Sequence, residues 1–244
     1  MDEKKYAVVT GSTKGIGKAI AKKLLQENFY VIANYAADEE TAKKCFEEMS
    51  EISNSFTLIH QKLDTWDSVQ KFSSAILKTT NSIDCLIINA ATTDRTPFNQ
   101  ITPEGWQRVI DVNLSAPFYL VQSLSHHIKP NTGSILFIGS LMGIYPHAMS
   151  VGYSVTKAAI HHMSKSLVKI FSPDGITVNV IAPSFVETPW QSKKPADIRE
   201  RIEAKIALHR FAEPEEIAEL CWHVINNRYI NGSVLEISGG YCYK

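Results

Sequence analysis

The chain has 244 residues, 44% of them hydrophobic and 20% charged, which is the composition of an ordinary globular protein with ample apolar material for a core. Its 25 Lys and Arg residues balance its 25 Asp and Glu residues, so the basic excess typical of nucleic-acid-binding proteins is absent. The apolar runs, such as 85–88 and 135–138, are too short to cross a bilayer, and residues 1–5 lack a signal-peptide pattern. We therefore expect a protein that contacts neither nucleic acid nor membrane.

The four cysteines stand singly along the chain, without the spacing of disulfide pairs or of metal ligands. They are Cys45, Cys85, Cys221 and Cys242. Isolated cysteines of this kind are typical of reduced structural thiols in a cytoplasmic protein. We expect a cytoplasmic location and no metal site.

Short runs rich in β-branched residues alternate with longer amphipathic stretches. The predicted strands are 6–10, 30–35, 56–63, 84–89, 134–139, 176–182 and 234–237. Most are apolar at both odd and even positions rather than alternating, as expected when helices cover both faces of a parallel sheet. The predicted helices are 18–27, 38–49, with Asp38 as its cap, 66–79, 103–127, 154–171 and 214–226. This order predicts one α/β domain over residues 1–244, a doubly wound Rossmann fold with a parallel seven-stranded sheet flanked by helices.

The first strand leads directly into a glycine-rich loop and then into a helix. The loop is Gly11-Ser12-Thr13-Lys14-Gly15-Ile16-Gly17, with the spacing G-x3-G-x-G rather than G-x-G-x-x-G. Glycines permit a tight turn and close approach of the backbone to a pyrophosphate, whose charge the helix N-terminus stabilises. A plain glycine-rich turn is the alternative, but this is the position at which a doubly wound fold binds its dinucleotide.

The end of the second strand bears on the choice of cofactor. An NAD-binding fold places a carboxylate there to bind the adenosine ribose, but this strand ends in Asn34-Tyr35-Ala36-Ala37. Asp38, the nearest acid, is better explained as the cap of the next helix. Lys14 in the glycine loop could bind a 2′-phosphate, unless it is simply a solvated lysine. The pattern favours NADPH over NADH.

Three residues near the middle of the chain form a candidate catalytic group. Ser140 follows the fifth strand, and Tyr153 and Lys157 come later with i, i+4 spacing, which places them on one face of a helix. A free tyrosine has a pKa of about 10. A neighbouring ammonium lowers that pKa towards the range useful for general acid–base catalysis. A Tyr-x3-Lys pair alone is more often a solvated pair, but here it coincides with Ser140 and the glycine loop.

Together these features resemble the short-chain dehydrogenase/reductase family over essentially the whole chain, and the β-ketoacyl carrier-protein reductases most of all. The glycine loop matches the family's cofactor loop, and Asn89-Ala90-Ala91 is similar to its Asn-Ala-Gly signature. Asn113 matches the asparagine of the catalytic tetrad, whose other members match Ser140, Tyr153 and Lys157. The remaining matches are Leu63-Asp64-Thr65 at the adenine, Pro183, Val186 and Thr188 at the nicotinamide carboxamide, and the C-terminal signatures 210–218 and 238–240.

The resemblance implies a role for each matched residue. Tyr153 donates the proton in the reducing direction, and Ser140 hydrogen-bonds the substrate oxygen. Lys157 lowers the pKa of Tyr153 and holds the nicotinamide ribose, while Asn113 positions a water that links Lys157 to solvent. The implied cofactor contacts outside the glycine loop are Tyr35, Asp64, Thr65, Asn89, Ala90, Tyr153, Lys157, Pro183, Val186 and Thr188.

The sequence departs from the family pattern at several points. Two glycines are replaced, by Ala91 and Ser184, and we expect only small backbone shifts there. The chain is also short between residues 225 and 230, which affects the end of the last helix but not the chemistry.

Other residues have simpler interpretations. The segment 187–206, with Trp190, is expected to form a mobile substrate lid, or else a plain surface excursion. The pairs His126-His127 and His161-His162 lack further ligands, so we expect them in surface or interface packing.

The resemblance implies NADPH-dependent reduction of a 3-oxoacyl group on acyl carrier protein, in fatty acid biosynthesis. Lys129, Lys165 and Lys169 could contact an acidic carrier, although the zero net charge gives no overall attraction. Another small ketone, sugar or sterol-like alcohol is the alternative substrate, and a non-catalytic dinucleotide sensor is a second alternative. The family commonly forms homotetramers, so we expect a homotetramer or homodimer that pairs helices 103–127 and 154–171.

Overall fold

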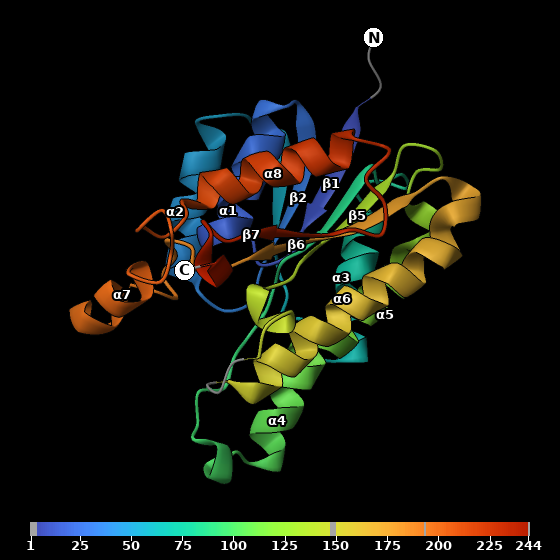
Figure 1. Ribbon diagram of the computed structural model, residues 1–244. Helices are drawn as coiled ribbons and strands as arrows, with labels where there is room; N and C mark the ends of the chain where they lie inside the picture. The colour runs from blue at the N-terminus through green and yellow to red at the C-terminus, as the bar shows by residue number, and fades with distance from the viewer. Residues whose placement is uncertain (1–3, 147–149, 193, 244) are drawn as a thin grey trace.

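Seven strands run parallel in one sheet, in the spatial order β3-β2-β1-β4-β5-β6-β7. A computed structural model describes residues 4–146, 150–192 and 194–243, apart from the side chain of Cys242 (Figure 1). The strands are β1 (Lys5–Val9), β2 (Phe29–Tyr35), β3 (Phe56–His60), β4 (Cys85–Ile88), β5 (Ser134–Ile138), β6 (Thr177–Pro183) and β7 (Val234–Ile237). All seven predicted strands are confirmed, with small differences at their ends, and the predicted doubly wound α/β fold is confirmed with them.

Helices cover both faces of the sheet, as the apolar strands predict. They are α1 (Gly15–Gln26), α2 (Glu39–Ser50), α3 (Trp66–Leu77), α4 (Pro103–Ile110), α5 (Ala116–Leu124), α6 (Val151–Phe171), α7 (Ala196–Glu203) and α8 (Pro214–Asn226). The predicted cap is confirmed, because the Asp38 carboxylate accepts a hydrogen bond from the Thr41 amide at 3.0 Å. Across the described part of the chain, none of these helices has the length and apolar character needed to span a bilayer.

The helix predicted over 103–127 is confirmed as one continuous helical run, but its hydrogen bonding changes along its length. The π-helical turn Asp111–Ser115 separates α4 from α5, and a short 3-10 turn follows α5. Pro117 lies in the first turn of α5 and has no N–H to donate to the carbonyl four residues earlier, at Asn113. A π turn is a common way to absorb such a gap and is frequent at functional sites. The interruption therefore falls at a predicted tetrad residue.

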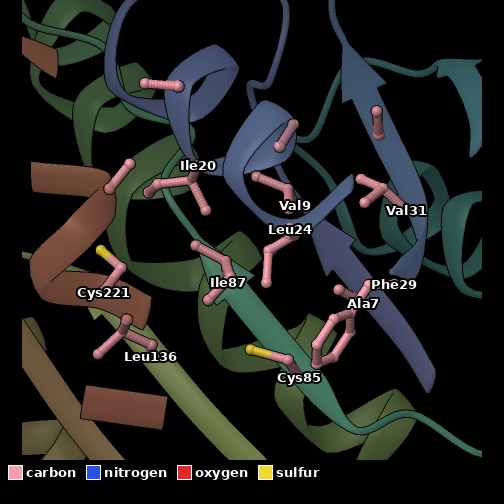
Figure 2. Close-up of a cluster of buried hydrophobic side chains, with 14 of the residues drawn as sticks. Ala7, Val9, Ile20, Leu24, Phe29, Val31, Cys85, Ile87, Leu136 and Cys221 are labelled. Atoms are coloured by element: carbon pink, nitrogen blue, oxygen red, sulfur yellow. The ribbon is translucent and has the colours of Figure 1, made fainter. Parts of the chain in front are cut away.

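Two apolar layers hold the helices to the sheet. One layer lies under α1, α2 and α8, and Figure 2 shows Ile20, Leu24 and Cys221 from the helices facing Ile87 and Leu136 from the central strands. The other layer lies under α3, α5 and α6. Cys45, Cys85 and Cys221 are buried free thiols, whereas the side chain of Cys242 lies outside the described residues. The two layers explain why the strands carry apolar residues on both faces of the sheet.

The strand order reverses at the centre of the sheet. From β1 the chain moves outward to β2 and β3, then returns to β4 on the other side of β1 and continues to β7. In open parallel sheets, ligands bind beyond the carboxyl ends of the strands where the order reverses. Here that position lies beyond β1 and β4.

Replacement of Phe72 by alanine tests the core under α3. Phe72 is fully buried there, so Phe72→Ala should lower the free energy of unfolding by about 3–5 kcal/mol. The matched control is Phe46→Ala on α2, where the ring is 51% exposed and the cost should be about 1 kcal/mol or less. Urea unfolding followed by circular dichroism measures both values. Equal losses in the two variants would contradict the assignment of the core.

Candidate active site

The loop between β1 and α1 has the geometry of a phosphate-binding turn. Gly15, where α1 begins, has a φ of +53°, in the left-handed region that favours glycine. A Cβ atom at Gly17 would overlap the carbonyl oxygen of Gly11, so the two ends of the loop touch. Lys14 is the N-cap of α1 and makes no side-chain hydrogen bond with the described residues of the first turn. The turn therefore fits a pyrophosphate, which would accept from the first-turn amides.

Two asparagine side chains fix this loop. Asn89 Nδ2, beyond β4, donates to the carbonyl oxygens of Thr10 at 3.0 Å and Gly11 at 2.9 Å. Asn34 Oδ1, at the end of β2, accepts from the Gly11 amide at 3.3 Å, and the Ser12 hydroxyl donates to the Asn34 carbonyl oxygen at 3.1 Å. Asn34 is absent from the predicted site, and the signal for it is a buried amide that ends an apolar strand. Both side chains preorganise the loop, which lowers the cost of binding.

Tyr35 and Lys14 lie at the adjacent carboxyl ends of β2 and β1. Tyr35 stacks on His60, with ring centroids 4.8 Å apart. Hydrogen bonds from the Thr41 side chain and amide lower the pKa of Asp38, and the charge of Lys14 lowers it further. Lys14 is therefore near enough to Asp38 to act on it electrostatically. The contact of Lys14 with a 2′-phosphate stays a prediction, and the capping carboxylate of Asp38 lies near this lysine.

The predicted adenine contacts follow β3. Asp64 forms an ion pair with Lys62, with 2.5 Å between Nζ and Oδ2. Thr65 caps α3 by accepting from the Ser68 amide at 3.1 Å, and the Ser68 hydroxyl accepts from the Thr65 amide at 3.0 Å. Asp64 and Thr65 thus lie at the predicted edge of the sheet, each with a partner in the protein.

The two positions where alanine and serine replace the family's glycines need no glycine here. The left-handed residues other than glycine, within the described ranges, are Asn28, Asn131, Ser150 and His209. Ala91 and Ser184 therefore have ordinary backbone angles. Next to Ala91, the Ala90 amide donates to the Thr10 hydroxyl at 3.0 Å. The Ser184 hydroxyl donates to the Ser238 carbonyl oxygen at 3.3 Å, so the replacement adds a contact.

Ser140, Tyr153 and Lys157 are brought together beyond β5. Tyr153 lies in the first turn of α6, where its hydroxyl is hydrogen-bonded to the Ser140 side chain. Lys157 Nζ lies 5.4 Å from the centre of the Tyr153 ring and donates to the Ile138 carbonyl oxygen at 2.6 Å. A hydroxyl pair with an ammonium one helical turn away can hold a carbonyl oxygen and move a proton to it.

Asn113 lies in the π-helical turn and joins the same group through α6. Its Oδ1 accepts from the Thr92 amide at 2.7 Å, and its Nδ2 donates to the Thr92 carbonyl oxygen at 2.8 Å. The same Nδ2 donates to the hydroxyl of Thr156, the residue before Lys157, at 3.1 Å. Asn113 therefore ties the segment after β4 to the helix that carries Tyr153 and Lys157.

The pKa values of Tyr153 and Lys157 follow their burial. Desolvation raises the pKa of Tyr153 to about 12, and the hydrogen bond from Ser140 opposes that rise. Desolvation lowers the pKa of Lys157 to about 8. The predicted lowering of the Tyr153 pKa is thus wrong for this structure, because removal of water from the phenol disfavours its charged form. A phenol with this pKa is a proton donor at neutral pH.

The prediction that His161 lies in surface or interface packing is also wrong. His161 is 7% exposed, and its Nε2 accepts a hydrogen bond from the Ser140 amide at 3.4 Å. Desolvation, together with the charges of Lys157 and Lys165, lowers its pKa to about 4. His126 and His162 are exposed, as predicted. No group of three or more His, Cys, Asp or Glu side chains in the described ranges could hold a metal ion.

The segment after β6 runs from the glycine loop to the tetrad. Val186 pairs with Ala212 in an isolated parallel bridge. A Cβ atom on Gly15 would lie 2.9 Å from the Thr188 methyl group, so Thr188 lies against the glycine loop. Trp190 packs edge-on against Tyr153, with ring centroids 5.8 Å apart. Pro183, Val186 and Thr188 thus lie on one segment that reaches both parts of the candidate site.

The predicted lid contains α7, and Arg199 of that helix anchors it through ion pairs. Arg199 of α7 forms an ion pair with Glu187, next to Thr188, and a second one with Glu203 at 2.7 Å. Its guanidinium also lies 4.5 Å from the centre of the Phe211 ring. Lys193, within the predicted lid, lies outside the described residues. The ion pair fixes α7 to the segment that approaches the glycine loop.

Substitution of Lys157 tests the burial of its ammonium through stability. Its pKa falls from 10.5 to about 8 on folding, so unfolding takes up a proton between these values and wild-type stability rises with pH. Relative to Lys157→Met, the wild type should gain about 3 kcal/mol of unfolding free energy from pH 8 to pH 10.5.

Urea unfolding at a series of pH values measures this difference. Lys165→Met, at an exposed lysine on the same helix, is the control for the loss of a lysine side chain as such. A pH-independent difference for Lys157→Met would show that the ammonium is solvated.

Comparisons with known proteins agree with this geometry. Residues 5–199 match the family model described as short chain dehydrogenase. The 3-oxoacyl-(acyl-carrier-protein) reductase FabG of Aquifex aeolicus is 34% identical, over 97% of this chain and 96% of that protein. The protein of the same name from Thermotoga maritima is 31% identical, over 98% of both chains.

Solved structures give the same result. A dehydrogenase/reductase from Sinorhizobium meliloti superposes with a TM-score of 0.91 at 28% identity, over 97% of this chain and 94% of that one. The Pseudomonas aeruginosa RhlG/NADP active-site complex superposes with a TM-score of 0.90 at 26% identity, over 97% and 96% of the two chains. The chain therefore belongs to the short-chain dehydrogenase/reductase family, whose members are oxidoreductases that use a nicotinamide dinucleotide to interconvert keto groups and alcohols.

Proposed function

We propose that this protein is an NADPH-dependent ketone reductase whose substrate is a 3-oxoacyl group on acyl carrier protein, in fatty acid biosynthesis. The observation that carries the proposal is the hydrogen bond between Tyr153 and Ser140, one helical turn from the buried ammonium of Lys157. The relatives named 3-oxoacyl-(acyl-carrier-protein) reductase, at 34% and 31% identity, support the substrate class.

In the proposed reaction, the nicotinamide supplies the hydride and the protein supplies the proton. Ser140 and Tyr153 together bind the substrate oxygen through their hydroxyl groups, which aligns the carbonyl for reaction. Tyr153 then protonates the developing alkoxide. Lys157, which is charged below its pKa of about 8, stabilises the phenolate that remains. Asn113 completes the proposed tetrad by linking Lys157 through water to solvent.

The proposed cofactor contacts begin at the glycine loop, residues 11–17. Lys14 would bind the 2′-phosphate, since β2 ends without a carboxylate at Tyr35. The NADP in the 26% identical RhlG complex supports this choice of dinucleotide. The other proposed contacts are Tyr35, Asp64, Thr65, Asn89, Ala90, Tyr153, Lys157, Pro183, Val186 and Thr188.

The segment 187–206 is proposed as the substrate lid, because Trp190 lies against Tyr153 and Thr188 lies against the glycine loop. Two features bear on carrier docking. Lys165 and Lys169 are exposed on α6 and could contact an acidic carrier. Lys129 Nζ lies 3.7 Å from Asp84 Oδ1, so this carboxylate partly offsets its charge.

We also propose that the protein forms a homotetramer. The large apolar side chains Trp106, Phe118 and Val155 are between 37% and 45% exposed on α4, α5 and α6, the helices expected to pair. The cytoplasmic location stays a prediction.

The decisive experiment compares NADPH and NADH oxidation with acetoacetyl thioesters, free and carrier-linked. We expect turnover with NADPH, and a loss of about 10²–10⁴-fold in kcat for Tyr153→Phe, which removes the proton donor. Tyr229→Phe, at a 98% exposed tyrosine, is the matched control and should keep wild-type kcat.

Three outcomes would revise the proposal. Turnover of other ketones or alcohols, but not of the thioesters, would favour the alternative substrates. Cofactor binding without any turnover would favour the dinucleotide sensor. Full activity of Tyr153→Phe would remove this tyrosine from the reaction.

The role of Lys14 has its own test. Loss of a charged contact with the 2′-phosphate in Lys14→Ala should raise the Kd for NADPH about tenfold or more. NADH lacks that phosphate and serves as the internal control, with a Kd that should stay within about twofold. Fluorescence titration measures both constants. Equal weakening of the two cofactors would assign Lys14 to the pyrophosphate or to loop structure instead.

A further inference from the structure

Three side chains of α6 hold the segment that follows β5. The Ser154 hydroxyl donates to the Met142 carbonyl oxygen at 2.5 Å, and Lys157 Nζ donates to that of Ile138 at 2.6 Å. His161 Nε2 accepts from the Ser140 amide at 3.4 Å. Residues 154, 157 and 161 share one face of the helix. This face therefore tethers the backbone on both sides of the Ser140 hydroxyl.

The His161 ring lies between two glycines of that segment. A Cβ atom at Gly139 would overlap His161 Nε2, and one at Gly143 would lie 2.8 Å from His161 Cε1. Neither glycine has a positive φ, so close contacts rather than a backbone turn exclude a side chain there. At Gly139 the ring acts together with Val180, and at Gly143 it acts together with the α6 backbone of Lys157. The imidazole is thus locked against the backbone that carries Ser140, as in a site built for one orientation.

The protonation state of His161 follows from its surroundings. To accept from the Ser140 amide, Nε2 has to be unprotonated, which places the ring proton on Nδ1. Burial and the neighbouring charges of Lys157 and Lys165 hold the pKa of His161 at about 4. The ring is therefore neutral, and able to accept, throughout the physiological pH range.

The orientation of Ser140 depends on its backbone. Its hydroxyl accepts from the Met142 amide at 3.2 Å and is hydrogen-bonded to the Tyr153 hydroxyl. Lys157 tethers the same segment, but the proposed reaction also requires that ammonium for the phenol and the ribose. His161 has no such second task, so its tether can persist while Lys157 changes partners.

We propose that His161 is a positioning residue, whose neutral imidazole holds the Ser140 amide so that the Ser140 and Tyr153 hydroxyls converge on the substrate oxygen. This role rests on the proposed ketone reduction. Because His161 lies beneath Ser140 and not at the substrate, its effect falls on alignment, and displacements of about 1 Å cost up to about 10²-fold in rate.

Two substitutions separate positioning from packing. His161→Leu keeps an apolar side chain of moderate size but removes the acceptor, and kcat should fall about tenfold to hundredfold. KM for the carbonyl and Kd for NADPH should stay within about twofold, since the loss lies in alignment. His161→Gln restores an acceptor oxygen, and it should recover kcat to within about threefold of wild type.

The matched control is His162→Leu, at the neighbouring exposed histidine, which should keep wild-type kcat. Unchanged kcat in His161→Leu would overturn the proposal. So would a glutamine variant no more active than the leucine variant, because a packing role gains nothing from a polar acceptor.

A second measurement does not depend on any substrate. Nitrogen-15 NMR of histidine-labelled wild-type protein should give an unprotonated Nε2 for His161, unchanged between pH 6 and pH 8. A protonated Nε2 would overturn the proposal even if the enzyme is active. Because this measurement uses the wild type, it also tests the proposal if the leucine variant does not fold. If the wild type reduces no carbonyl, the proposed function fails, whereas the tautomer still tests the tether.

Discussion

Lys157 keeps an ammonium group where water barely reaches it, and much of the site is arranged around that group. The residue is 4% exposed, and the Ile138 carbonyl oxygen accepts a hydrogen bond from its Nζ at 2.6 Å. Burial brings its pKa to about 8, so the charge is kept near neutral pH only by a narrow margin. In the proposed reaction that charge is needed when Tyr153 gives up its proton, because a nearby cation stabilises a desolvated phenolate. The same burial costs stability, as expected of a functional site.

The sequence predicts the fold well because burial leaves a local pattern. Strands that are apolar at both parities, such as 134–139, indicate a sheet covered on both faces, and the capping pattern at Asp38 indicates where a helix begins. The helix predicted over 103–127 is present, but its π turn is not predicted, since hydropathy continues through Pro117 although the α-helical hydrogen-bond pattern does not. Periodicity reports which faces are buried, and it does not report which backbone donors are missing.

Site residues are predictable to the extent that their motifs are local. The glycine loop and the Tyr153–Lys157 spacing indicate their own geometry. Asn34 and His161 act on segments 22 and 21 residues away, at Ser12 and Ser140, and no spacing rule connects them to those targets. The prediction of a lowered pKa for Tyr153 is wrong for the same reason. The desolvation that raises this pKa comes from the whole fold and not from the neighbour one helical turn away. Such residues become visible only when the elements are packed.

The two glycines that contact the His161 ring couple substitutions at positions 139, 143 and 161. A side chain at 139 or 143 would overlap the imidazole, and a larger residue at 161 would in turn meet the backbone of both glycines. Substitutions at 139, 143 and 161 are therefore epistatic, with effects that depend on order and do not add. Loss of the histidine would relieve only part of the overlap, because a Cβ atom at 139 would still lie 2.6 Å from Val180 Cγ1 and one at 143 would still lie 2.7 Å from the backbone of Lys157. Both glycines are therefore required by the packing of α6 and β6 against this segment, and the histidine adds to that requirement.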